Sequence, residues 1–255
     1  MTLRVCQPKP ALMSADADYR AYADEIHRAR AEGPDAFQGW FDGGSTEKEA
    51  VRNGYWDFGT FITTHCVRNH LGWTRRERCL EIGYGGGRLL NAACDFFGQA
   101  IGVDVHDEED AVRAFLMARG KTNFELLKGT GDSLPVETAS IDFVYSYIVL
   151  QHLRSFATLQ RYVSEASRCL RPGGVAQLYF GRFANVPRPA LLKHGWRGRI
   201  ELRGAPVNAT SLVVRVRTMR RLAQRCGLRV LEAKRDQGGQ GHLTLSQPDS
   251  TPPAA

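Results

Sequence analysis

Residues 79–90 of the chain read CLEIGYGGGRLL, and the interpretation of the remaining sequence starts from this stretch. Mostly apolar residues run into Gly-Tyr-Gly-Gly-Gly and then return to apolar positions. Such a pattern predicts a buried strand that ends abruptly, turns on glycine and enters a helix. Gly83, Gly85 and Gly87 would let the backbone turn tightly and bring its amides close to a ligand. The stretch alone does not say which ligand.

Strand-like and helix-like segments alternate over the chain that follows. Near-continuous apolar strands separated by amphipathic helices are typical of a parallel sheet covered by helices on both faces. The pattern predicts an α/β fold with a doubly wound, mostly parallel, seven-stranded sheet. The predicted strands are residues 78–83, 100–105, 123–129, 141–147, 175–180, 228–236 and 241–247.

The first 72 residues lie outside this alternation and predict a helical N-terminal cap. Apolar positions recur at helical spacing over residues 14–31, and Gly33-Pro34 ends that helix. A glycine-rich turn is expected over residues 37–50. A second helical segment then continues to Gly72.

A second departure follows the fifth predicted strand. Residues 181–210 lack a long periodic run, and we expect the insert over residues 181–217 to act as a lid or acceptor-binding segment. Within it, RIELRG (199–204) and SLVVRVR (211–217) are candidates for an extra hairpin. The expected organisation is thus a cap (1–72), a main domain (73–247) that holds the insert, and a disordered tail (248–255).

The composition is that of a globular protein, with 43% hydrophobic and 24% charged residues. No segment approaches the roughly 18 apolar residues of a membrane span, and no signal-peptide pattern is present. The six cysteines form no Cys-x-x-Cys pair and have no metal-site spacing with histidine. We therefore expect a cytoplasmic protein with free thiols, no membrane association and no metal.

Positive charge is concentrated in the last third of the chain. Residues 182–235 contain 14 lysines and arginines against two glutamates, whereas residues 1–181 hold more acids than bases. The electrostatic field of such a cluster of positive charges attracts an anionic substrate or a nucleic acid. A solvated, arginine-rich surface has the same composition, so both interpretations stay open.

The spacing of the glycines separates the possible ligands. A dinucleotide loop requires a small residue five positions after its first glycine, and Arg88 stands there. A triphosphate loop requires Gly-Lys-Ser/Thr, which does not follow. Asp104 and Asp132 come after the next two predicted strands. Carboxylates at successive strand ends suit the hydroxyls and amine of a nucleoside without phosphates.

Five segments, in order, resemble the motifs of the class I S-adenosylmethionine-dependent methyltransferases. The resemblance extends from about residue 78 to residue 246. It implies a Rossmann-like methyltransferase fold, S-adenosylmethionine as cofactor, and transfer of its methyl group. The segments are LEIGYGGGRLL (80–90), GVDV (102–105), GTGDSLP (129–135), IDFVYSYIVLQHL (141–153) and CLRPGGV (169–175).

The resemblance also implies cofactor contacts. The glycine loop would wrap the methionine end, Asp104 would hold the ribose hydroxyls, and Asp132 with the Ser133 amide would hold the adenine. Glu81 either contacts the ligand or only orders the glycine loop, and Ser146 lies where family members approach the sulfur. The expected cofactor-binding residues are Trp56, Glu81, Gly83, Tyr84, Gly85, Gly87, Asp104, Val105, Gly131, Asp132, Ser133 and Ser146.

Methyl transfer needs an acceptor nucleophile aligned with the sulfur–methyl bond, and an alcohol acceptor also needs a base. His152 and Tyr147 follow the fourth strand and are the candidate catalytic residues, although a packed histidine explains His152 equally well. An aromatic cap and a basic insert suit a planar or apolar metabolite that carries an anionic group. The candidate substrate residues are Tyr19, Tyr22, His27, Tyr55, Phe58, Arg182, His194 and Trp196.

We therefore expect a biosynthetic enzyme that methylates a small molecule, with oxygen favoured over nitrogen or carbon. An RNA or protein methyltransferase that uses the basic last third is an alternative, although the Asn/Asp-Pro-Pro-Tyr/Phe motif for base amines is absent. A non-catalytic homologue that binds S-adenosylmethionine is another alternative. A nicotinamide-dependent dehydrogenase is a further one, and Arg88 at the third small position weighs against it. The acceptor, the methylated atom and the choice between monomer and homodimer stay open.

Overall fold

The fold is known from a computed structural model of the chain. For residues 15–20 only the backbone is described. The described ranges are residues 15–72, 76–181, 186, 190, 192, 195–202, 204–235 and 240–249.

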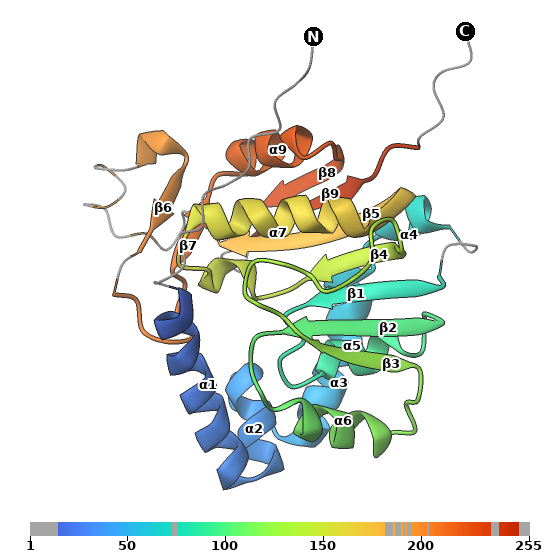
Figure 1. Cartoon of the computed structure of the whole chain (residues 1–255), viewed down its shortest axis with the longest axis vertical. Helices are drawn as coiled ribbons and strands as arrows, with labels where there is room; N and C mark the ends of the chain where they lie inside the picture. The colour runs from blue at the N-terminus through green and yellow to red at the C-terminus, as the bar shows by residue number, and fades with distance from the viewer. Residues whose placement is uncertain are drawn as a thin grey trace, which may run out of the picture.

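A single sheet forms the centre of the molecule, and its strands lie where the apolar runs predict them (Figure 1). The strands are β1 (Arg78–Ile82), β2 (Gln99–Asp104), β3 (Phe124–Lys128), β4 (Ile141–Ser146), β5 (Leu170–Gly181), β6 (Arg199–Glu201), β7 (Leu212–Val214), β8 (Arg229–Arg235) and β9 (Gln240–Ser246). Seven of them pair in the order β3-β2-β1-β4-β5-β9-β8. β9 is antiparallel to both of its neighbours and the other pairs are parallel. The predicted doubly wound, mostly parallel fold is confirmed.

The two remaining strands form the extra hairpin of the insert. β6 and β7 pair in antiparallel fashion, with Ile200 opposite Val213. Val213 also pairs with Gly181 at the end of β5, which joins the hairpin to the sheet. A Cβ at Gly181 would lie 2.3 Å from the carbonyl oxygen of Leu212, so this close approach requires glycine.

Helices cover both faces of the sheet. The longer ones are α1 (Ala15–Glu32), α2 (Pro34–Phe41), α3 (Glu47–Asp57), α4 (His65–Leu71), α5 (Arg88–Ala93), α6 (Glu109–Met117), α7 (Phe156–Cys169) and α9 (Val216–Arg225). Apolar residues of α7 and α9 pack on one face, and those of α3 to α6 pack on the other. In Figure 1, α7 lies in front of the strands and α5 lies behind them. Two short helical turns are η1 (Phe58–Ile62), which follows α3, and η2 (Leu150–His152), which ends at the pocket residue His152.

The cap contains more helix than the sequence predicts. Residues 37–50 were expected as a glycine-rich turn, but α2 and the start of α3 occupy most of them. Pro34 stands in the first turn of α2, where its fixed φ favours a helix. Thr46 and Glu49 form a capping box that starts α3. The turn is thus confined to the residues between the two helices.

Candidate active site

The glycine loop (residues 83–87) joins β1 to α5 at the carboxyl edge of the sheet. Gly83, Gly85 and Gly87 have φ angles of 80°, 51° and 84°, a region that favours glycine. Among the described residues, the amides of Tyr84 and Gly86 have no hydrogen-bond partner. Both residues line a pocket, so their amides are available to an anionic group such as a carboxylate.

Helix α2 of the cap packs directly on this loop. A Cβ at Gly85 would lie 2.7 Å from the ring of Phe41, and a Cβ at Gly86 would lie 2.5 Å from Oε1 of Gln38. The Gln38 side chain also donates a hydrogen bond of 2.9 Å to the carbonyl of Gly86. Two of the glycines are therefore required by the cap.

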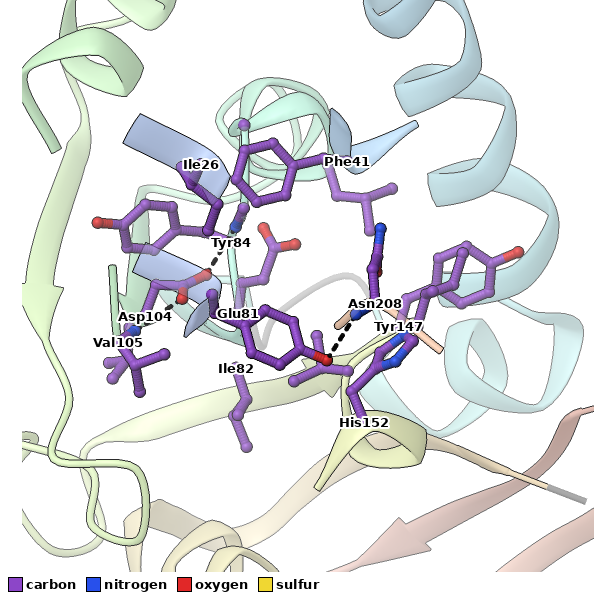
Figure 2. Close-up of a pocket in the computed structure, with 18 of the residues that line it drawn as sticks. Ile26, Phe41, Glu81, Ile82, Tyr84, Asp104, Val105, Tyr147, His152 and Asn208 are labelled. Carbon is purple, nitrogen blue, oxygen red and sulfur yellow. Dashed lines mark hydrogen bonds between the residues drawn. The ribbon is translucent and has the colours of Figure 1, made fainter. Parts of the chain in front are cut away.

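Asp104 ends β2 beside the glycine loop. Its carboxylate accepts hydrogen bonds from the amides of Gly85 (2.8 Å) and Val105 (2.6 Å). His106 lies 3.0 Å from the carbonyl of Gly85 through Nε2. Asp104 and Val105 line the pocket, as Figure 2 shows, so the carboxylate both orders the loop and faces the ligand space.

Glu81 is a buried acid in the wall of the same pocket. Its side chain accepts a hydrogen bond of 3.0 Å from the hydroxyl of Tyr145. Burial raises the pKa of Glu81 to about 8, against the opposing effects of Tyr145 and Arg88. A cationic group placed beside Glu81 would favour its ionised form, because opposite charges attract strongly in a buried site.

Arg88 is held by the cap, as expected for an arginine that pairs with a nearby acid. Its guanidinium lies 3.3 Å from Asp42 and 2.7 Å from Asp57, and its side chain is 9% exposed. It lines the pocket but its charge is already balanced. A pyrophosphate would therefore lack a free cation at this point, whereas a ligand with an ammonium and a diol fits the acids of the site.

The pocket encloses about 160 Å³ beneath the cap. Most of its lining is apolar or aromatic, and it extends from the glycine loop to the turn η2. Figure 2 shows Ile26 and Phe41 of the cap opposite the side chains of the sheet. Side chains that line it include Tyr22, Ile26, Trp40, Phe41, Glu81, Tyr84, Asp104, Val105, Tyr147, His152, Tyr162 and Asn208.

The two candidate catalytic residues lie together on one wall. Tyr147 stacks on Phe61, with ring centroids 5.6 Å apart, and meets the Tyr179 ring edge-on at 5.0 Å. His152 lies in η2, and Nδ1 is 3.0 Å from the carbonyl oxygen of Ala209. Burial lowers the pKa of His152, so the ring is neutral at neutral pH. Their catalytic roles stay predictions.

Three predicted contacts of α3 and η1 lie away from the pocket. The Trp56 side chain is 70% exposed on the outer side of α3. Tyr55 donates a hydrogen bond to Asp95 at the protein surface. Phe58 is buried, but it packs against Phe96 within the core. The sequence places these residues near the glycine loop, and helical rotation directs their side chains elsewhere.

Other candidate substrate residues are distributed outside the pocket. His27 lies 2.8 Å from Glu108, with a side chain that is 76% exposed. Trp196 is 78% exposed beneath the guanidinium of Arg197. Tyr19 lies in α1, with no described side chain, and two further candidates lie outside the described residues: Arg182 and His194. Of the predicted substrate residues, Tyr22 is the one placed in the pocket.

Several predicted cofactor residues also lie outside the pocket. Asp132 forms an ion pair with Arg161, and its neighbours Gly131 and Ser133 do not line the cavity. Ser146 is fully buried and donates a hydrogen bond of 3.0 Å to the carbonyl of Ile82. Gly87, the last residue of the loop, is the N-cap of α5 and does not line the pocket. The adenine contacts assigned to residues 131–133 stay predictions.

Asn208 is a site residue that the sequence did not suggest. Its amide donates a hydrogen bond of 3.2 Å to the Tyr22 hydroxyl, which Figure 2 marks, and its side chain donates one of 3.2 Å to the carbonyl of Trp40. Its φ of 62° lies in the left-handed region, which asparagine tolerates better than most residues. Asn208 thereby connects the cap to the segment between β6 and β7.

The described residues contain neither a metal-ligand cluster nor a helix that could span a membrane. In the described ranges, no three histidine, cysteine or acidic side chains cluster as metal ligands. No helix within those ranges is long and apolar enough to span a bilayer.

Part of the chain is similar to known methyltransferases. Residues 80–178 match the model of a methyltransferase domain. The "Uncharacterized methyltransferase YcgJ" of Bacillus subtilis is 29% identical over 46% of this chain and 44% of its own length. A "Probable S-adenosylmethionine-dependent methyltransferase" of Mycolicibacterium smegmatis is 35% identical over 38% of this chain and 35% of its own. The chain thus spans less than half of either relative.

A solved structure shows the same fold. An S-adenosylmethionine-dependent methyltransferase from Clostridium acetobutylicum aligns with a TM-score of 0.59 and 13% identity. The alignment covers 76% of this chain and 92% of that one. The methyltransferase-domain match over residues 80–178 contains the glycine loop and Asp104. Residues 80–178 therefore match a methyltransferase domain, and the chain shares the fold of a solved S-adenosylmethionine-dependent methyltransferase.

Proposed function

We propose that the protein transfers a methyl group from S-adenosylmethionine to an oxygen of a small aromatic or apolar metabolite. The observation that carries this proposal is the partly open pocket, in which the glycine loop and the aromatic residues of the cap face one another. Pockets with mostly apolar walls and few polar groups are typical of small-molecule sites.

The residues of the site fit the parts of the cofactor. The free amides of Tyr84 and Gly86 suit its carboxylate, Glu81 suits its ammonium, and Asp104 suits its ribose hydroxyls. The cofactor supplies a methyl group on a positively charged sulfur, which makes that carbon electrophilic. The aromatic wall would hold the acceptor and exclude water, and the neutral His152 ring would receive its proton.

Calorimetry with S-adenosylhomocysteine tests the first half of the proposal. A folded sample that shows no binding would refute it. Incubation of the protein and labelled S-adenosylmethionine with a metabolite extract tests the second half. Label recovered in a small molecule, on oxygen, supports the proposal, and label recovered only in RNA or protein contradicts it.

A second candidate, an RNA methyltransferase, is favoured by the outer face of α9. Arg217, Arg220, Arg221 and Arg225 are exposed there, and no acid forms a salt bridge with them among the described residues. Binding of a labelled RNA that weakens steeply with salt would support it. Salt-insensitive or undetectable binding would contradict the RNA methyltransferase and leave the small-molecule methyltransferase as the remaining candidate.

We also infer that the protein acts in the cytoplasm and that residues 1–72 and the insert form the acceptor side. Five cysteines are described, and all of them are free thiols. Free buried thiols are typical of a reducing compartment. The hydrogen bonds of Asn208 support this assignment of the acceptor side, because they join the cap to the insert across the pocket.

A further inference from the structure

Both ring nitrogens of His152 are engaged by other groups of the protein. Nδ1 lies 3.0 Å from the carbonyl oxygen of Ala209, and Nε2 lies 3.1 Å from the side-chain nitrogen of Gln151. A carbonyl oxygen only accepts hydrogen bonds, so Nδ1 must carry the proton. An amide nitrogen only donates, so Nε2 must present its lone pair. The contacts therefore select one of the two neutral tautomers.

A second glutamine fixes the first. The side chain of Gln240, at the start of β9, donates a hydrogen bond of 2.8 Å to Oε1 of Gln151. Since that oxygen accepts from Gln240, the Gln151 nitrogen is the atom directed at His152. The orientation of the amide is thus determined by β9, a strand that does not line the pocket.

The backbone around this pair is equally constrained. Ser211 donates from its amide to the carbonyl of Gln151 (2.9 Å) and from its hydroxyl to the carbonyl of His152 (2.8 Å). A Cβ at Gly181 would lie 3.2 Å from Cβ of Gln151, so the end of β5 also limits its position. The turn η2 is therefore attached to the segment before β7 and to the sheet.

We propose that Gln151 and Gln240 are positioning residues for methyl transfer, which hold His152 as the Nδ1-protonated tautomer with Nε2 as its acceptor atom. This inference rests on the proposed function, because an acceptor hydroxyl is what would use Nε2. That hydroxyl would replace the Gln151 amide at Nε2. Its oxygen would give the proton to Nε2 and an electron pair to the methyl carbon, and the sulfur–carbon bond would break with its electrons left on sulfur.

The surroundings of His152 suit this role. The carbonyl of Ala209 would stabilise the imidazolium through Nδ1, as the orienting group does in nucleophile–base pairs. Burial lowers the pKa of His152, Arg154 lowers it further, and the carbonyls of Ala209 and Ile148 raise it. Other titratable side chains on the pocket wall are Tyr22, Glu81, Tyr84, Arg88, Asp104, Tyr147 and Tyr162.

Histidine NMR of the full chain, without cofactor or acceptor, tests the proposal. The wild-type His152 resonances, assigned with H152Q, should show an unprotonated Nε2. In Q151L, the loss of the amide that stabilises the neutral ring should raise the pKa of His152 by about half to one pH unit. Q240L should also raise the pKa of His152, but by a smaller amount. Q224L, at an exposed position of α9, is the matched control and should change nothing.

A protonated Nε2 in the wild type, or a His152 pKa that is unchanged in Q151L, would overturn the proposal. If Q151L does not fold, Q151E replaces it. The carboxylate of Q151E should raise the pKa of His152 further and place a proton on Nε2. These measurements involve no ligand. Failure of S-adenosylhomocysteine to bind would therefore refute the proposed function without changing the NMR result for His152, so the two outcomes can be told apart. Once an acceptor is known, the acid limb of the kcat/KM profile should move upward with the pKa in Q151L.

Discussion

The two halves of the pocket are built in different ways. The half that we propose for the cofactor, called the cofactor half, is formed by β1, the glycine loop and the end of β2, which is one continuous piece of chain. The half that we propose for the acceptor, called the acceptor half, combines cap residues such as Tyr22 and Trp40 with His152 and Asn208, which are far apart in the sequence. Backbone hydrogen bonds to Asp104 stabilise the first half. The second depends on side-chain contacts between separate segments, so it should be easier to open.

The largest expected effect concerns Glu81 in the cofactor half. Its pKa is about 8 in the folded protein and near 4.5 when unfolded, so between these values the folded state holds a proton that the unfolded state has lost. The free energy of unfolding should therefore fall by about 1.4 kcal/mol per pH unit as the pH rises through this window. E81Q should lack this fall.

Urea unfolding at pH 5 and pH 8 measures the difference. The gap between E81Q and the wild type should widen in favour of E81Q at the higher pH. E137Q, at an exposed position, should follow the wild type. Parallel pH dependence of E81Q and wild type would show that Glu81 is ionised in the folded protein.

Asp104 should have the next largest effect. D104A removes the acceptor of two backbone amides and of the proposed ribose contact. Hydrogen bonds to charged groups contribute about 1.5–3 kcal/mol, so the affinity for S-adenosylhomocysteine should fall by about 10- to 100-fold. Calorimetry measures this, with D107N as a nearby exposed control. If the affinity of D104A stays within twofold of the wild-type affinity, Asp104 does not contribute to cofactor binding.

The contact between the two halves can be tested at Gly86. G86A places a Cβ 2.5 Å from Oε1 of Gln38, so the buried Gln38 side chain must move and its hydrogen bond to Gly86 is disturbed. The free energy of unfolding should fall by about 1–3 kcal/mol, as in other overpacked sites. The double variant G86A/Q38A should recover part of this loss. G59A, where a Cβ meets nothing within 4 Å, is the control. Additive effects of G86A and Q38A would contradict the contact.

The smallest effect is expected in the acceptor half at Asn208. N208G keeps a residue that adopts positive φ but removes the hydrogen bond to Trp40. Loss of about 0.5–1.5 kcal/mol should accelerate amide exchange in α2 by about 2- to 10-fold. Exchange in β1 should be unchanged. An equal acceleration in β1 would indicate global destabilisation and remove the argument for cap opening.

The cofactor half could be predicted from the sequence because its signals are local. The glycine spacing, the apolar strand before it and Asp104 at the end of the next strand lie within residues 78–105. The alternation of strands and helices likewise indicated a mostly parallel sheet covered by helices on both faces. These expectations required no knowledge of which distant segments meet.

The acceptor half could not be predicted in the same way. Its glycines suggested a turn over residues 37–50, whereas Pro34 and the Thr46–Glu49 capping box stabilise helices there. Asn208 and Trp40 meet across 168 positions of sequence, and no local pattern encodes that contact. Trp56 was predicted by proximity in the chain, but the rotation of α3 turns it to solvent. Tertiary packing decides each of these positions.

The contact of α2 with the glycine loop implies cooperativity between the two ligands. Gln38 holds Gly86, while Trp40 and Phe41 of the same helix line the pocket. A ligand that stabilises the loop would therefore also stabilise the helix that encloses the acceptor. Thermodynamic linkage requires the effect to be reciprocal, so each ligand should change the affinity of the other by the same factor. The cap is then a shared element of two binding equilibria.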